Sequence, residues 1–299
     1  FFFKQKTAYE IYQCDWSSDV CSSDLYVDSL AAELTGWSNV GDRLAAAFAN
    51  DEFCLYAQRI QALGPGGRAM HEVLIRLREE EENLMPPGAF LPLAERHGLM
   101  PQLDRWVVRH VLDWVAAAPA RREAIYSLNV APSTIEDESF GGDVWRLLHE
   151  RELPGSVLCF EFDALATDDG PTLHLATLLR DAGCHVALSQ VGRGDGSLRR
   201  LKNLHPQFLK LDGSVVLQLV RDRVAAAKVN AIVQLATRIN AQTIAELVED
   251  EATIAALRAA GVHFAQGFAI ARPQPIEDLM MQDSGSAPDR KSTRLNSSH

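Results

Sequence analysis

Short apolar runs alternate along the chain with longer segments of helical period. The apolar runs are rich in branched and aromatic residues and lie at residues 53–57, 69–77, 124–130, 157–163, 185–191, 208–211, 243–248 and 263–268. Amphipathic helices are predicted between most of them, at residues 101–116, 140–151, 172–182, 196–203, 217–240 and 250–260. Eight strands interleaved with helices predict an α/β fold, a TIM-like (β/α)8 barrel. A doubly wound sheet is the alternative.

Polar residues interrupt this pattern in or just after the predicted strands, where a buried parallel strand should be apolar. They are Gln58, Glu72, Arg76, Asn129, Glu161, Ser189, Gln190, Lys210, Asp212, Glu246 and Gln266. A barrel gathers the carboxyl ends of its strands at one face, so we expect these side chains to converge. Carboxylates, an amide, a lysine and an arginine at one mouth are typical of a metal and phosphate site. Each residue taken singly also fits a structural ion pair.

Composition narrows the range of partners. The 299 residues carry 29 basic and 40 acidic side chains, a net charge of -11, and 47% of them are hydrophobic. This balance predicts a soluble globular protein, excludes extensive disorder and argues against a nucleic-acid duplex as partner. A small anionic ligand in a local basic pocket remains compatible with it. No run of about 18 uncharged apolar residues predicts a membrane span.

Cysteine usage predicts a reducing compartment. Cys54, Cys159 and Cys184 each lie in or beside an apolar segment, and none has a partner at CxxC or CxxH spacing. Buried, reduced thiols in a cytoplasmic protein are therefore expected, without a disulfide framework or a zinc site.

Both ends of the chain are unusual. The segments DWSSDVCSSDL (residues 15–25) and DRKSTRLNSSH (residues 289–299) can be encoded by DNA strings that are reverse complements over almost their whole length. They resemble a translated sequencing adapter, so residues 1–25 and 289–299 are interpreted as non-native. Natural serine-rich tails are the alternative. We expect a lead-in helix or linker from an upstream module at 26–50, one domain at 51–280 and a short tail at 281–288.

The residues in this domain resemble a known family. Glu72-Val73-Leu74-Ile75-Arg76 is similar to the EALLR signature of the EAL family, cyclic di-GMP phosphodiesterases built on a modified TIM barrel. The resemblance extends from Asp51 to Pro275. Its further segments are 56–58 (family YQP), 90–99 (FLPLAERHGL), 127–129 (SVN), 160–161 (LE), 209–212 (IKID), 245–249 (AEGVE) and 266–268 (QGY).

The resemblance implies two divalent cations, Mg or Mn, that activate a water to open one phosphodiester. By position, Glu72, Asn129 and Glu161 match ligands of the first metal. Lys210 matches a lysine near the attacking water, and Glu246 matches a second-metal ligand or base. Arg76 matches a phosphate contact. The full set of ligand-binding candidates is Gln58, Glu72, Leu74, Arg76, Asp104, Asn129, Asp212, Glu246 and Gln266.

Departures from the family pattern point away from hydrolysis. Ser189-Gln190 replaces the adjacent Asp-Asp that bridges the two ions, and Ala164 replaces a glutamate that braces the following loop. Without an anionic bridge two dications repel each other, so we expect the second ion to be lost and the first site to be vestigial. No cofactor is therefore expected, and Mg or Mn would be needed only for residual activity.

A catalytically impaired receptor for cyclic di-GMP is the favoured function, because Gln58, Arg76 and Asn129 are kept. A weakly active metal-dependent phosphodiesterase and a non-binding interaction scaffold are the alternatives. A second copy of the chain or another protein is a further candidate partner.

Overall fold

Eight strands close into a barrel in the computed structural model, which describes residues 37, 39–78, 84–164, 169–193 and 204–279. The closed order is β1-β2-β4-β5-β6-β7-β8-β9 and back to β1. Strands β2 and β4 to β9 are parallel, whereas β1 is antiparallel to both of its neighbours. The predicted TIM-like (β/α)8 barrel is confirmed, with its first strand reversed.

The barrel strands coincide closely with the apolar runs. They are β1 Phe53–Ala62, β2 Met70–Arg78, β4 Ile125–Asn129, β5 Leu158–Asp163, β6 His185–Val191, β7 Phe208–Leu211, β8 Gln242–Ala245 and β9 Phe264–Ala265. Two short strands, β3 Leu84–Met85 and β10 Gln274–Pro275, pair with β2 and β1.

Helices surround the barrel. They are α3 Val40–Ala49, α4 Pro87–Arg96, α5 Met100–Ala116, α6 Pro132–Ile135, α7 Phe140–Glu150, α8 Asp169–Asp181, α10 Gly213–Gln218, α11 Arg223–Arg238 and α12 Glu251–Ala259. Short 3-10 turns lie at Pro119–Glu123, Gly155–Val157 and Ile276–Leu279. None of the helices in the described ranges has the length and apolarity to span a bilayer.

Several element predictions were wrong in detail. The helix expected at 217–240 is α11, which begins only at Arg223 because Asp222 caps it by accepting a hydrogen bond from the amide of Val224 at 2.8 Å; residues 217 and 218 are the end of α10. Strand β1 continues through Ala62, so Gln58 lies inside it and not after it. Helices α4 and α6 were missed because prolines at 87, 92 and 132 weaken the helical pattern. The helix predicted at 196–203 lies outside the described residues.

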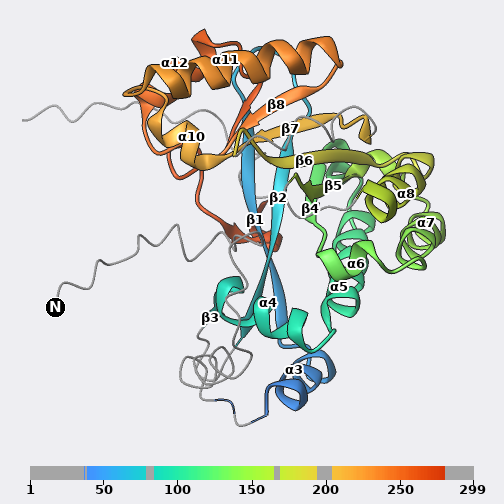
Figure 1. Cartoon of the computed structure of the whole chain (residues 1–299). Helices are drawn as coiled ribbons and strands as arrows, with labels where there is room; N and C mark the ends of the chain where they lie inside the picture. The colour runs from blue at the N-terminus through green and yellow to red at the C-terminus, as the bar shows by residue number, and fades with distance from the viewer. Residues whose placement is uncertain (1–36, 38, 79–83, 165–168, 194–203, 280–299) are drawn as a thin grey trace, which may run out of the picture.

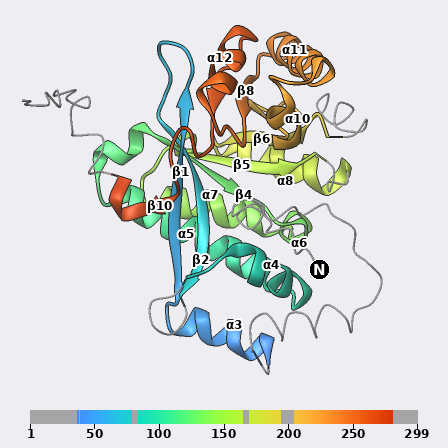
Figure 2. The same cartoon turned by 90° about the vertical axis from the view of Figure 1, so that its left-hand side faces the viewer.

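Strands β1 and β2 form a long antiparallel ribbon that extends beyond the barrel wall. Their register runs from Phe53 opposite Leu77 to Ile60 opposite Met70. Figures 1 and 2 show this ribbon reaching from the end of the molecule that carries α11 and α12 to the end that carries α3. The ribbon therefore carries side chains from inside the barrel to well outside it.

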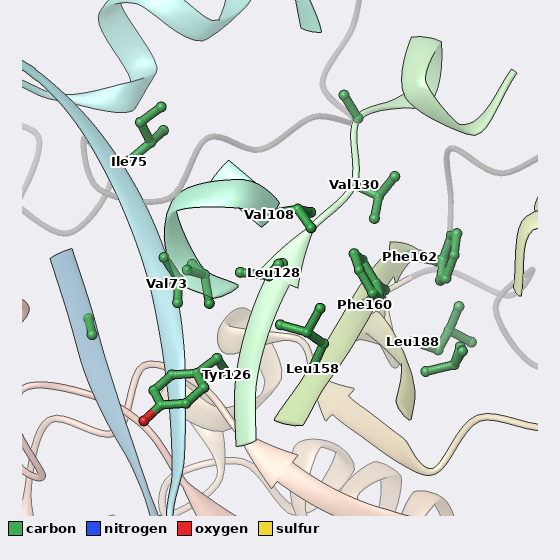
Figure 3. Packing of buried hydrophobic residues seen from close by; sticks show 14 of the residues in the cluster. Val73, Ile75, Val108, Tyr126, Leu128, Val130, Leu158, Phe160, Phe162 and Leu188 are labelled. Carbon is green, nitrogen blue, oxygen red and sulfur yellow. The ribbon is translucent and has the colours of Figure 1, made fainter. Parts of the chain in front are cut away.

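Packing occurs in two separate layers. Outward-facing side chains of the strands pack under the helices: Figure 3 shows Val73 and Leu128 near Val108 of α5, with Phe160 and Leu188 farther along the same layer. A second cluster fills the barrel interior with one side chain from each strand: Ile60, Met70, Ile125, Cys159, Ala187, Phe208, Ile244 and Phe264. This second cluster is an apolar floor that closes one end of the barrel.

The turn before β5 requires a glycine. A Cβ added to Gly155 would lie 2.6 Å from the carbonyl carbon of Gly183 and 2.8 Å from the amide nitrogen of Cys184. Because these atoms are backbone, they cannot move aside. We expect Gly155→Ala to lower the free energy of unfolding by at least about 2 kcal/mol, measured by urea titration. The control Gly142→Ala, with open space around the added Cβ, should stay within about 1 kcal/mol of wild type. Equal effects of the two substitutions would contradict this packing.

Candidate functional site

A layer of polar side chains lies directly above the apolar floor. Side chains two positions apart on a strand share a face, so the residues that follow the floor also point inward. They are Gln58, Glu72, Ser127, Glu161, Ser189, Lys210, Glu246 and Gln266. Because β1 runs antiparallel to the other strands, the residue above Ile60 of the floor is two positions earlier in the chain, Gln58. Gln58 thus joins the site through the register of β1 opposite Glu72, and not as a residue at a strand end.

Lys210 is the centre of this layer. Its Nζ lies 2.6 Å from Glu161 Oε2, 2.8 Å from Glu246 Oε1 and 3.3 Å from Glu72 Oε2. The lysine is 1% exposed. Three carboxylates from β2, β5 and the end of β8 are therefore held by one ammonium group from β7.

Amide side chains extend the cluster toward β1. Asn129 Nδ2 donates to Glu72 Oε1 at 2.9 Å, and Gln266 Nε2 donates to Glu72 Oε2 at 2.6 Å and to Gln58 Oε1 at 2.9 Å. Gln58 in turn donates to the carbonyl of Ala271 at 2.9 Å. Glu72 thus accepts hydrogen bonds from two amides and a lysine.

The three carboxylates differ in acidity because their surroundings differ. Burial favours the neutral form of Glu72, but Lys210, Gln266 and Asn129 outweigh it and lower the pKa. Burial raises the pKa of Glu161 to about 7; the charge of Lys210 opposes this shift, and repulsion from Glu72 and Glu246 adds to it. Burial also raises the pKa of Glu246. For Lys210, burial opposes the charge, yet the three glutamates raise its pKa well above the ordinary value.

Ser127 belongs to the layer but was not among the predicted site residues. Ser127 is fully buried, and its hydroxyl donates to Glu161 Oε1 at 2.6 Å. A serine in an apolar strand carries little chemical signal by itself. Its position midway between Ile125 of the floor and Asn129 on the same strand face is the signal that marks it.

Leu74 and Arg76 continue the inner face of β2 beyond Glu72, onto the β1–β2 ribbon. Arg76 is 3% exposed, lies over the ring of Tyr56 at 5.5 Å and donates to the carbonyl of Ile75 at 2.8 Å. These residues therefore lie farther from the floor than the ion cluster does.

Asp104 and Asp212 occupy two other positions near the mouth. Asp104, on α5, accepts a hydrogen bond from the amide of Ala131 at 3.0 Å, two residues after Asn129. Burial raises its pKa to about 7. Asp212 follows β7 and caps α10 by accepting from the amide of Ser214 at 3.0 Å. Its role in the described structure is that of a helix cap.

The pair Ser189-Gln190 lies at an irregularity of β6. The register with β7 shifts between Leu188 and Val191, and Gln190 has a left-handed backbone with a φ of 56°. Ser189 Oγ donates to the carbonyl of Phe162 at 3.3 Å, and Gln190 Nε2 donates to Asp163 Oδ2 at 3.0 Å. Ala164, buried beside them, donates its amide to the carbonyl of Ser189 at 3.2 Å. Both polar side chains are thus bonded to the end of β5.

The donors for a first metal are close together, but they are engaged with one another. Glu72 accepts from Asn129, while Glu72 and Glu161 both bind Lys210. Within the described ranges no group of three or more His, Cys, Asp or Glu side chains is arranged to hold a metal ion.

The arrangement matches a known domain. The model of the EAL domain family matches residues 42–273. The chain belongs to the EAL domain family. The match covers the whole barrel, including the reversed β1 and the polar layer.

Curated relatives of this EAL domain carry phosphodiesterase names. It is 32% identical to the cyclic di-GMP phosphodiesterase PdeF of Escherichia coli over 80% of this chain and 32% of that protein. It is 29% identical to the cyclic di-GMP phosphodiesterase PdeB of Shewanella oneidensis over 80% of this chain and 28% of that protein. The chain therefore spans about a third of the length of these relatives.

Solved EAL structures share the barrel. The cyclic di-GMP complex of the PaMucR phosphodiesterase has a TM-score of 0.72 and 30% identity, covering 80% of this chain and 99% of that one. The EAL domain of FimX from Pseudomonas aeruginosa, bound to cyclic di-GMP, has a TM-score of 0.74 and 24% identity. It covers 79% of this chain and 97% of that one, and at this identity it supports the fold alone.

Removing the ammonium group of Lys210 should strongly lower the stability of the EAL domain. Lys210→Met leaves three buried carboxylates without their ammonium partner, and we expect it to lower the free energy of unfolding by about 3–5 kcal/mol at pH 7.5. Urea unfolding followed by circular dichroism measures the loss. The exposed Lys228→Met, on α11, is the control and should change stability by less than about 0.5 kcal/mol. A Lys210→Met protein as stable as the control would contradict the ion cluster.

Asp104 makes stability depend on pH. Its pKa is raised in the folded state, so folding favours the protonated form, and stability falls as pH rises toward 7 and then levels off. Asp104→Asn should remove this loss and gain about 2 kcal/mol on wild type between pH 5.5 and pH 8. Chemical unfolding at the two pH values tests this, with the exposed Asp181→Asn on α8 as control. A gain that does not change with pH would refute the burial of a charge at this position.

Proposed function

We propose that this EAL domain is a receptor that binds cyclic di-GMP without hydrolysing it efficiently. The observation that carries the proposal is Ser189-Gln190 on β6, at the position where the family has an adjacent pair of aspartates. A hydroxyl and an amide bring no negative charge to the mouth. Both are instead bonded to the end of β5.

The residues present do not fit a pair of divalent ions. Two close dications need an anionic bridge to offset their repulsion. The donors that remain are Glu72, Asn129 and Glu161 for a first ion and Glu246 for a second, and Ser189-Gln190 supplies no carboxylate to bridge the two ions. Lys210 Nζ already pairs with two of these donors, Glu161 at 2.6 Å and Glu72 at 3.3 Å. The chain's own residues therefore favour a site that binds a nucleotide and is poorly suited to activate water.

Binding is supported by the groups that the mouth retains. Arg76 offers a planar guanidinium for phosphate oxygens. Gln58 lies opposite Glu72, nearer the apolar floor than Arg76, and adds a polar side chain to the layer below. A carboxylate can accept from the N1-H and exocyclic amine of guanine, which makes Asp104 and Glu246 the candidates for reading a base edge. The PaMucR phosphodiesterase, 30% identical, is described as a cyclic di-GMP complex.

Two measurements on the full chain test the proposal: titration calorimetry with cyclic di-GMP, and product analysis after incubation with excess Mg²⁺ or Mn²⁺. We expect binding at micromolar Kd or tighter without formation of the linear dinucleotide. Arg76→Ala should weaken binding at least about tenfold, because a charged hydrogen-bond donor is lost. Arg146→Ala, an exposed arginine on α7, is the control and should leave the Kd unchanged.

Each other outcome identifies a different function. Metal-dependent turnover would overturn the proposal in favour of a weak phosphodiesterase. Absence of binding with and without metal would overturn it in favour of a protein-interaction scaffold.

A further inference from the structure

The turn after β8 contains a leucine with a strained backbone. Leu247 has a φ of 55°, in the left-handed region that bulky residues rarely adopt. The AEGVE motif of the family has glycine at this position, for which such a φ carries no penalty. Because strained residues persist only where the surroundings hold them, this outlier invites a functional explanation.

Leu247 packs against Gly213, the first residue of α10 just after β7. A Cβ added to Gly213 would lie 3.1 Å from Leu247 Cβ and would overlap the Cγ and Cδ1 atoms. Gly213 follows Asp212 and lies three residues after Lys210. The leucine side chain thus occupies the space that any side chain at position 213 would need.

The same turn is closed on its other side by Gly267. A Cβ added there would lie 2.7 Å from the carbonyl carbon of Val248 and closer still to its nitrogen and oxygen. The amide of Val248 donates to the carbonyl of Gln266 at 3.0 Å, and the amide of Ala269 donates to the carbonyl of Val248 at 3.0 Å. Residues 246–248 are therefore wedged between the ends of β7 and β9.

We propose that Leu247 is a positioning residue for the mouth of the barrel. By filling the space over Gly213 it fixes the turn so that Glu246 Oε1 stays 2.8 Å from Lys210 Nζ. Glu246 Oε2 is then held in place as the acceptor for the base edge of the nucleotide, a step that rests on the proposed function. Leucine in place of glycine at position 247 thus restricts the motion of Glu246 and keeps its carboxylate paired with Lys210.

Thermal unfolding of single and double variants tests the wedge without any ligand. Gly213 has no positive φ, so Gly213→Ala should be harmful only because of Leu247. We expect Gly213→Ala to lower the Tm by about 5 °C or more, and Leu247→Gly to abolish most of this loss in the double variant. Equal losses in both backgrounds would overturn the packing argument.

A second cycle tests positioning as distinct from packing. Glu246→Gln should lower the Tm in wild type, and by less than about half as much in Leu247→Gly, because the ion pair is no longer held in place. The exposed Glu249→Gln is the control and should have the same small effect in both backgrounds. If the changes in Tm caused by Glu246→Gln and Leu247→Gly simply add, Leu247 does not position Glu246, and the proposal is overturned.

Calorimetry with cyclic di-GMP, well below the Tm, completes the test. Leu247→Gly should weaken binding about tenfold, mainly through faster dissociation, while Leu247→Met, which keeps the side-chain volume, should stay within about threefold of wild type. Affinity unchanged in Leu247→Gly would overturn the role in binding. If wild type binds no cyclic di-GMP, the proposed function fails, and the two thermal cycles still decide whether Leu247 positions Glu246.

Discussion

One ammonium group, Nζ of Lys210, holds three carboxylates together inside the barrel. Burial of a lysine or a glutamate alone would be prohibitive, so each charge is stable only while its partners stay within ion-pair distance. Because Glu72, Glu161 and Glu246 come from separate strands, the same requirement restrains the strands at the mouth. The amides of Asn129 and Gln266 complete the arrangement by donating to Glu72. The apolar floor lies directly beneath the cluster and keeps water from that side. An unpaired charge in the cluster would therefore cost even more free energy.

The reversed first strand gives the barrel its asymmetry. A parallel β1 would present its inner residues in the opposite order, whereas the antiparallel register sets Gln58 opposite Glu72. It also pairs β1 with β2 over most of their length, so the inner face of β2 continues past the barrel rim. Arg76 is thereby carried above the ion cluster and stacked on Tyr56. Arg76 and the buried carboxylate of Glu72 therefore lie on one continuous face of β2.

The mouth of this chain differs from the family pattern where charge and backbone freedom matter most. Ser189-Gln190 removes two negative charges from β6, and Leu247 adds bulk where the motif has glycine. The first change weakens the case for a metal pair, and the second tightens the packing around Glu246. Both changes lie at residues or turns with left-handed backbones, Gln190 and Leu247.

The order of strands and helices, the family and nearly all the polar candidates were predictable from sequence, because hydrophobic period and short motifs are local properties. Leu217–Asn240 looked like one helix, since apolar spacing does not reveal a cap such as Asp222. Gln58 looked like a strand-end residue, since the direction of β1 depends on pairing and not on the order of residues. Ser127 and Leu247 became visible only through what they touch. The amino-acid sequence by itself determined which chemical groups are available. Only the tertiary structure decided which of them share one buried volume, because the pairing of distant strands brings Lys210 within reach of three glutamates.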